Sequence, residues 1–178
     1  WWGHSDDVTT YDYDPEKAKS LLSEAGYGDG VKVTLSSWTN PRPYLPAPRD
    51  AVSLIKSDLA AIGIDVTIKT MKWSAFRASR GIGDYNMTMG GWISGTLDPD
   101  GILYALYHSK YIRKKDALNW ARYKDSSLDS LLDKARTIYD QSERTPLYQE
   151  AANKISDAAI GLFFAHPVTA IATRSNVK

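Results

Sequence analysis

The chain has 178 residues, and 22 lysines and arginines nearly balance 21 aspartates and glutamates. This length is enough for one domain with a substantial core, and the net charge of +1 gives no reason to expect binding to nucleic acid or to an anionic membrane. Cysteine is absent, which excludes disulfide bonds and thiolate metal sites.

The first half of the chain predicts helices that alternate with strands. After an irregular arm, Asp14 and Pro15 mark a helix start, because aspartate can cap free N–H groups and proline fits the first turn. Helices that cross between strands are typical of α/β proteins, so we expect a central sheet with helices on both faces. In order, we expect a helix over 14–25, a strand over 31–38, a helix over 49–62, a strand over 64–68, a helix over 73–80 and a strand over 85–89.

The second half predicts mainly helices. Asp98 can cap a helix whose first residue is Pro99, and Ser142 is the expected cap of the last helix. The expected elements are a helix over 98–107, helices over 128–138 and 142–158, and strands or extended segments over 160–164 and 168–173.

Two loops carry the residues that we single out for ligand binding. The segment 39–48 contains four prolines, so neither a helix interior nor a central strand can form there. A loop stiffened in this way lowers the entropy lost when the guanidinium of Arg42 is held in place. The second loop begins at Gly90 and presents Trp92 between a strand end and a helix start, which is where α/β proteins bind ligands.

Patterns typical of enzymes and metal sites are missing. His4, His108 and His166 have no partner three or four residues away, which leaves a zinc site unsupported. The glycines at 81 and 83 precede a strand, which is the wrong order for a phosphate-binding loop. We therefore expect no catalysis, no cofactor and no metal. A hydrolase fragment and a protein-interaction module remain the alternatives.

Four stretches along the chain carry a resemblance to a known family. They are 13–26, Pro41-Arg42-Pro43-Tyr44, 60–64 and 90–101. In this order they resemble the periplasmic dipeptide- and oligopeptide-binding proteins of ABC transporters, the extracellular solute-binding family 5. Members of that family fold as two lobes around a cleft, in a type II-like arrangement. The resemblance implies that residues 1–178 form a single α/β domain, most of the C-terminal lobe, and that the N-terminal lobe is absent from this chain.

The resemblance implies ligand contacts for Arg42, Tyr44 and Trp92. In the dipeptide-binding branch, an arginine in this Arg-Pro-Tyr context binds the C-terminal carboxylate of the ligand, and a guanidinium does so through two parallel hydrogen bonds. Tyr44 is its neighbour, and Trp92 is expected to form a flat wall for the ligand. The alternatives are a solvated arginine and a tryptophan packed in the core.

Gly95 departs from the family pattern. Peptide-binding members typically have an aspartate three residues after this tryptophan, and it pairs with the α-amino group of the ligand. Asp98 is a candidate replacement, although capping the helix is a competing role, and the hydroxyl of Ser94 and the backbone of Gly95 offer uncharged hydrogen-bonding groups. We therefore expect a dipeptide or short oligopeptide, with a sugar, an opine or a similar solute as the alternative.

The resemblance also implies a location and partners. We expect a monomeric periplasmic receptor that closes on its ligand with the missing N-terminal lobe and delivers it to ABC permease subunits. The chain opens on Trp1 and Trp2 without an initiator methionine. We therefore expect that both ends were cut from a larger protein whose signal peptide lies upstream.

Overall fold

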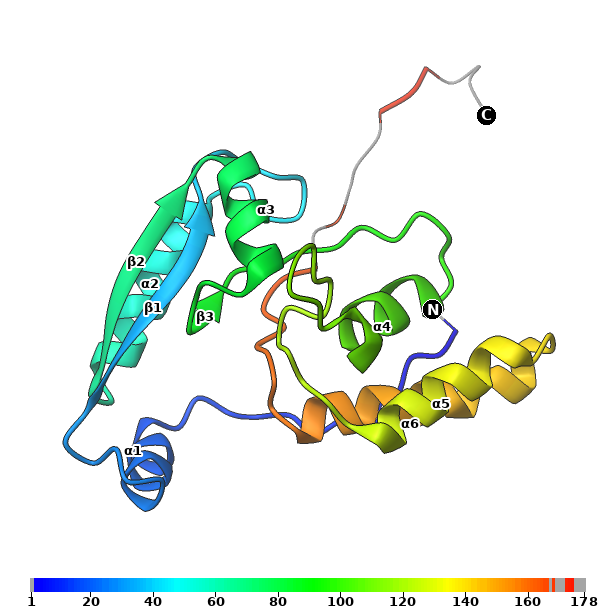
Figure 1. Ribbon diagram of the computed structural model, residues 1–178, viewed down its shortest axis with the longest axis horizontal. Helices are drawn as coiled ribbons and strands as arrows, with labels where there is room; N and C mark the ends of the chain where they lie inside the picture. The colour runs from blue at the N-terminus through cyan, green and yellow to red at the C-terminus, as the bar shows by residue number, and fades with distance from the viewer. Residues whose placement is uncertain (1, 167, 169–171, 175–178) are drawn as a thin grey trace.

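The computed structural model describes residues 2–166, 168 and 172–174. Figure 1 shows a strand-containing half with helices α2 and α3, and a helical half formed by α4, α5 and α6. The helices are α1 (Pro15–Glu24), α2 (Pro48–Ala60), α3 (Trp73–Ile82), α4 (Asp100–Tyr107), α5 (Ser126–Thr137) and α6 (Gln141–Asp157), with a short 3-10 helix, η1 (Ser109–Tyr111). The strands are β1 (Val31–Trp38), β2 (Ile64–Met71) and β3 (Met87–Thr88).

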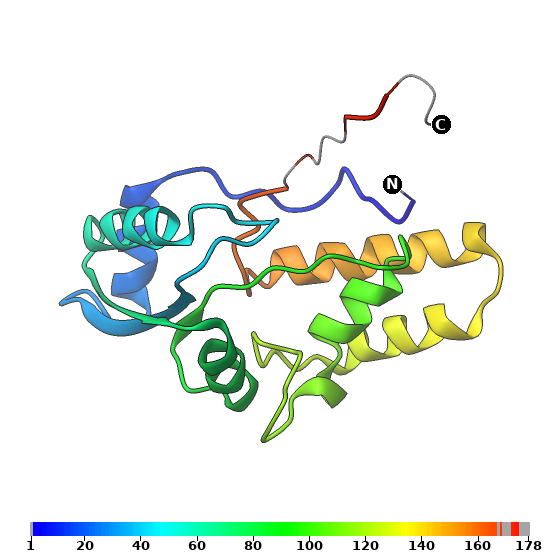
Figure 2. The same ribbon diagram turned by 90° about the horizontal axis from the view of Figure 1, so that it is seen from above.

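The sheet is parallel, with the strand order β2-β1-β3. Strands β1 and β2 pair along their full length, whereas β3 pairs with β1 over two residues only. The third strand is therefore shorter than the predicted 85–89. At Asn86 the side-chain oxygen, in place of a backbone carbonyl, accepts the hydrogen bond from the Thr34 backbone N–H at 2.8 Å. Figures 1 and 2 place α2 and α3 on opposite faces of the sheet, which confirms the predicted α/β arrangement.

The core of the strand-containing half lies where β1 ends. The side chains of Trp38 and Phe76 are fully buried there. The ring of Trp38 lies 5.5 Å from that of Trp73 and 5.1 Å from that of Phe76, so the start of α3 packs on the end of β1. This packing fixes α3 directly beneath the loop that follows β1.

A second core joins the helices to the N-terminal arm. Tyr148 of α6 is fully buried and packs edge-on against Trp2, with 5.7 Å between ring centroids. Further along α6, the side chain of Gln149 donates to the carbonyl of His4 at 2.6 Å, and the hydroxyl of Ser156 donates to the carbonyl of Thr9 at 2.6 Å. The arm therefore runs along α6, as Figure 2 shows.

Helix α1 starts as predicted but does not bury its apolar face. The carboxylate of Asp14 accepts from the backbone N–H of Lys17 at 2.9 Å, which is the expected cap. No residue of α1 is buried, and Leu21 is 54% exposed, because the helix projects away from both cores (Figure 1). The periodicity predicted the helix correctly, but the residues that the structure describes do not cover its apolar face.

Two predicted helix starts need correction, and one C-terminal segment can be assessed. Helix α6 is capped by Asp140 and not by Ser142, since the Asp140 carboxylate accepts from the backbone N–H of Ser142 at 2.7 Å. Helix α4 begins at Asp100, with Pro99 at the capping position. The segment 160–164 has no regular secondary structure and therefore forms no strand. Of the segment expected over 168–173, residues 169–171 lie outside the described residues.

Candidate functional site

The loops that follow β1 and β3 meet at the same end of the sheet. A Cβ atom at Gly91 would overlap the ring of Tyr44, so this ring lies directly on the glycine backbone. Only glycine allows that approach. The structure therefore brings the Arg42 loop and the Trp92 loop together, although they are far apart in the sequence.

Arg42 is held in a tight turn above α3. Its backbone N–H and carbonyl pair with those of Leu45 at 3.0 and 2.9 Å. Its guanidinium carbon lies 3.7 Å from the ring centroid of Trp73, a cation–π distance. Nε of Arg42 is buried and has no hydrogen-bond partner, and none of the ion pairs among the described residues involves Arg42. The guanidinium is thus oriented by an aromatic ring and is not neutralised by a carboxylate.

Tyr44 is half-buried between the core and the second loop. Its ring meets that of Trp38 edge-on, with 6.0 Å between centroids. Burial raises the pKa of the Tyr44 phenol, and this effect outweighs the opposite influence of Arg80 and Arg42. The hydroxyl therefore stays neutral at physiological pH and is able to donate a hydrogen bond.

Trp92 lies at the surface and belongs to neither core. It is 36% exposed, and its ring centroid lies 6.1 Å from that of Trp120. The backbone of Gly90 passes close to the same Trp120 ring, because a Cβ at this glycine would lie 3.0 Å from it. Trp92 and Trp120 together form a partly exposed aromatic wall beside the Arg42 loop.

Sequence reasoning missed Arg80, which is only 7% exposed. Its guanidinium carbon lies 3.6 Å from the ring centroid of Trp120 and 4.9 Å from that of Phe76. Burial lowers the pKa of Arg80 to about 10, so the group remains protonated at neutral pH. The signal was available in the helical spacing, since residues 73, 76 and 80 lie on one face of α3.

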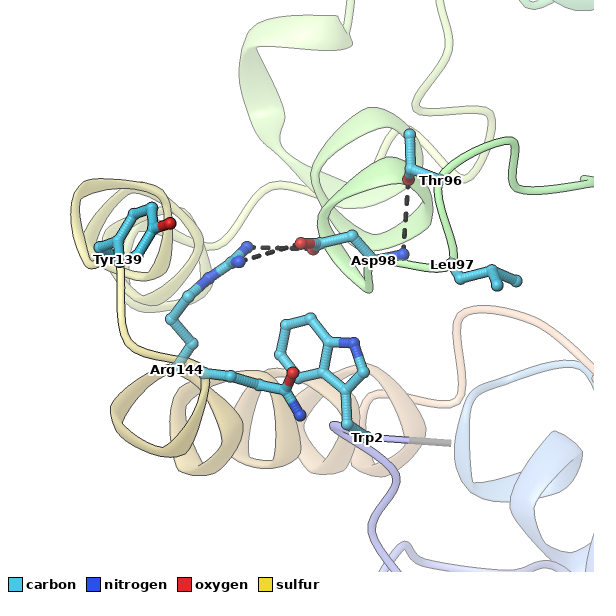
Figure 3. Close-up of a pocket in the computed structure, with 7 residues that line it drawn as sticks. Trp2, Thr96, Leu97, Asp98, Tyr139 and Arg144 are labelled. Atoms are coloured by element: carbon cyan, nitrogen blue, oxygen red, sulfur yellow. Dashed lines mark hydrogen bonds and ion pairs between the residues drawn. The ribbon is translucent and has the colours of Figure 1, made fainter.

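Asp98 is paired with α6. Its two carboxylate oxygens accept from Nη1 and Nη2 of Arg144 at 2.9 and 3.0 Å, as Figure 3 shows. One of these oxygens also accepts from the backbone N–H of Asp100 at 2.9 Å. The pair borders an open pocket of about 570 Å³ that is also lined by Trp2. The Asp98 carboxylate therefore already has a cationic partner, Arg144. The sequence alone had left a ligand amine as a candidate for that position.

Ser94 and Gly95 differ in their contacts within the loop. The Ser94 hydroxyl accepts from the backbone N–H of Thr96 at 3.4 Å. Gly95 is exposed, and an added Cβ would have no atom within 4 Å. A side chain at position 95 would thus fit without a clash, so space does not explain why the aspartate typical of peptide-binding members is missing.

The described residues contain neither a cluster of metal ligands nor a membrane-spanning helix. Within residues 2–166, 168 and 172–174, no three histidine, aspartate or glutamate side chains converge to hold a metal ion. Over the same ranges, no helix combines the length and the apolar character needed to cross a bilayer.

Comparisons with known proteins give a consistent result. Residues 1–114 match the model of the bacterial extracellular solute-binding proteins, family 5 Middle. The chain is 32% identical to the dipeptide-binding protein of Escherichia coli K12, across 99% of this chain and 33% of that protein. It is 34% identical to heme-binding protein A of Haemophilus influenzae, across 94% of this chain and 30% of that protein.

A solved structure agrees with this assignment. The periplasmic binding protein DppA of Helicobacter pylori, in complex with the peptide STSA, matches with a TM-score of 0.81 and 36% identity, across 89% of this chain and 30% of that chain. The chain thus spans about a third of the length of the proteins that it matches. On the evidence of the family model and of a fold shared with such a receptor, this chain belongs to family 5 of the bacterial extracellular solute-binding proteins, which are receptors and not enzymes.

Proposed function

We propose that the chain is most of the C-terminal lobe of a periplasmic receptor that captures a dipeptide or short oligopeptide and delivers it to an ABC permease. A missing N-terminal lobe forms the other wall of the cleft, and the complete receptor works as a monomer. The chain itself performs no chemistry. Two matched proteins are named for peptide ligands, which supports this ligand class.

The observation that carries the proposal is the state of Arg42. A guanidinium stacked on Trp73, without a carboxylate partner among the described residues, is ready to bind the C-terminal carboxylate of a peptide. Tyr44 adds a neutral hydroxyl beside it, and Trp92 adds a flat apolar surface. Aromatic walls with a few polar groups are typical of small-ligand sites.

A second ligand class is favoured by one observation. Gly95 places no charge where peptide-binding members typically hold the α-amino group, and Asp98 is engaged by Arg144. A solute without an α-amine, such as a sugar or an opine, would lose nothing at this position. In this alternative the receptor role is unchanged and only the cargo differs.

Calorimetric titration of the full-length protein with one dipeptide in three forms tests the proposal. The forms have free ends, an acetylated N-terminus and an amidated C-terminus. We expect acetylation to be tolerated and amidation to abolish binding, because Arg42 then has no carboxylate to hold. The variant Arg42→Met should abolish binding, whereas Arg49→Met, at an exposed position after the same loop, should not change it. Failure of all three forms to bind would refute the peptide function and favour the second ligand class.

A further inference from the structure

The wall formed by the two loops and α3 contains two guanidinium groups. Arg42 and Arg80 lie against the same indole ring, with their guanidinium carbons 3.7 and 5.9 Å from the centroid of Trp73. Neither takes part in any ion pair formed by the residues that the structure describes. Two like charges in one partly buried wall repel each other, and an anion between the loops would relieve that repulsion.

Arg80 is the more unusual of the two. Its side chain is more than nine-tenths buried among Trp120, Phe76 and Trp73, and Nη1 has no hydrogen-bond partner. Aromatic faces attract a cation but accept no strong hydrogen bonds, so the buried Nη1 of Arg80 is left without an acceptor. Buried charges in proteins are nearly always paired, because an unpaired one loses its hydration without compensation. An arginine kept in this state indicates a counter-charge from outside the described residues.

The acidic groups near Arg80 and in the two loops do not supply that counter-charge. Asp84, four residues after Arg80, is bound by Lys69 at 2.8 Å. Asp98 is already bound by Arg144 through both carboxylate oxygens. Tyr44, whose pKa burial raises, is neutral at physiological pH. Gly95 has no side chain. The wall therefore has a surplus of positive charge and favours a ligand with a surplus of negative charge.

We infer that the preferred ligand carries a second carboxylate in addition to the one held by Arg42, and that Arg80 is the specificity-determining residue for it. The ligand class is an acidic peptide or a related dicarboxylate. The inference rests on the proposed receptor function and adds the charge of the cargo. Arg80 would attract the second carboxylate through its charge and its N–H donors. Because Arg80 is buried, this attraction is less screened than it would be at the surface.

Two peptides of almost equal shape test the inference on the full-length protein. N-acetyl-Ala-Glu and N-acetyl-Ala-Gln differ in one charge, and acetylation removes the amine as a variable. In calorimetric titrations we expect the glutamate form to bind about tenfold more tightly, the gain typical of one charge-assisted hydrogen bond. Arg80→Met should remove this preference, so that the two peptides bind with equal affinity. Arg77→Met, at an exposed position of the same helix, should keep the preference.

Each other outcome overturns a distinct claim. Equal affinity of the wild-type protein for the two peptides refutes the inference and leaves the receptor function intact, and the counter-charge of Arg80 then comes from the rest of the protein. This comparison needs no variant, so it decides the matter even if Arg80→Met does not fold. A preference that persists in a folded Arg80→Met protein refutes the role of Arg80. Absence of binding by both peptides, and by the free dipeptide, refutes the peptide function itself.

Discussion

Introducing a carboxylate at position 95 should give the receptor a contact with the α-amine of a peptide ligand. Gly95 is exposed, its backbone is not in the left-handed region, and an added Cβ would have no atom within 4 Å. The substitution Gly95→Asp therefore places an acidic side chain in the Trp92 loop without a clash. A free α-amine on the ligand would then gain a charged partner.

The expected gain follows from two opposing terms. A hydrogen bond between charged groups contributes about 1.5–3 kcal/mol, and ordering the new side chain costs roughly 0.5–1 kcal/mol. The net gain of about 1–2 kcal/mol corresponds to an affinity that is roughly 5- to 30-fold higher for a dipeptide with a free amine. The gain should fade above about pH 8, where the α-amine loses its proton.

Calorimetry of the full-length Gly95→Asp protein with free and N-acetylated forms of one dipeptide measures this effect. The acetylated form should show no gain, because it has no cationic amine. Gly161→Asp is the matched control, since it adds the same carboxylate at another glycine with open space and outside the loop. An unchanged affinity for the free dipeptide would show that position 95 does not face the ligand amine.

Three further predictions concern stability and are tested by urea unfolding of the full-length protein. Gly91→Ala should destabilise it by about 1–3 kcal/mol through overlap with the tyrosine ring that packs on it, whereas Gly95→Ala should be nearly neutral; equal effects would contradict the close packing. Arg144→Met should cost about 2 kcal/mol, because the partly buried carboxylate of Asp98 loses its bidentate partner; a loss under about 0.5 kcal/mol would contradict this. Asp125 caps α5, and its hydrogen bonds to the start of that helix lower the pKa of the Asp125 carboxyl group to about 2. The stabilisation by this cap is therefore present above the ordinary pKa near 3.8 and is lost as the pH falls toward 2. Asp125→Ala should cost about 1 kcal/mol at pH 7 and flatten the acid limb of the stability curve; an unchanged limb would contradict this.

Much of the fold could be predicted because its elements have strong local signals. The alternation of apolar residues in β1 and β2 and the helical spacing in α2 predicted parallel strands with crossovers. The clustered prolines before α2 predicted the loop that holds Arg42. The starts of helices were harder to predict. Before α6, both Asp140 and Ser142 have side chains that can cap a helix, and the backbone geometry that decides between them is not visible in the sequence.

The candidate site was harder to predict because its groups are defined by tertiary contacts. The helical spacing placed Arg80 on the same face of α3 as Trp73 and Phe76, but it did not indicate that the 116–123 loop would fold over Arg80 and place Trp120 on it. Likewise, Asp98 has a partner 46 residues away in α6, a distance at which sequence spacing carries no information. The amphipathic pattern of α1 predicted the helix but not its surroundings, because such a pattern does not show which segment covers the apolar face.

The packing of the N-terminal arm along α6 affects the order in which the molecule folds during synthesis. The core around Trp38 uses residues from 33 to 89, so its partners emerge from the ribosome close together in time. Trp2, by contrast, packs on Tyr148, and the carbonyl of Thr9 accepts a hydrogen bond from Ser156, which is 147 positions later in the chain. The earliest part of this chain to be made is therefore among the last to reach its native place, and an exposed tryptophan must be kept from wrong partners until α6 has been synthesised.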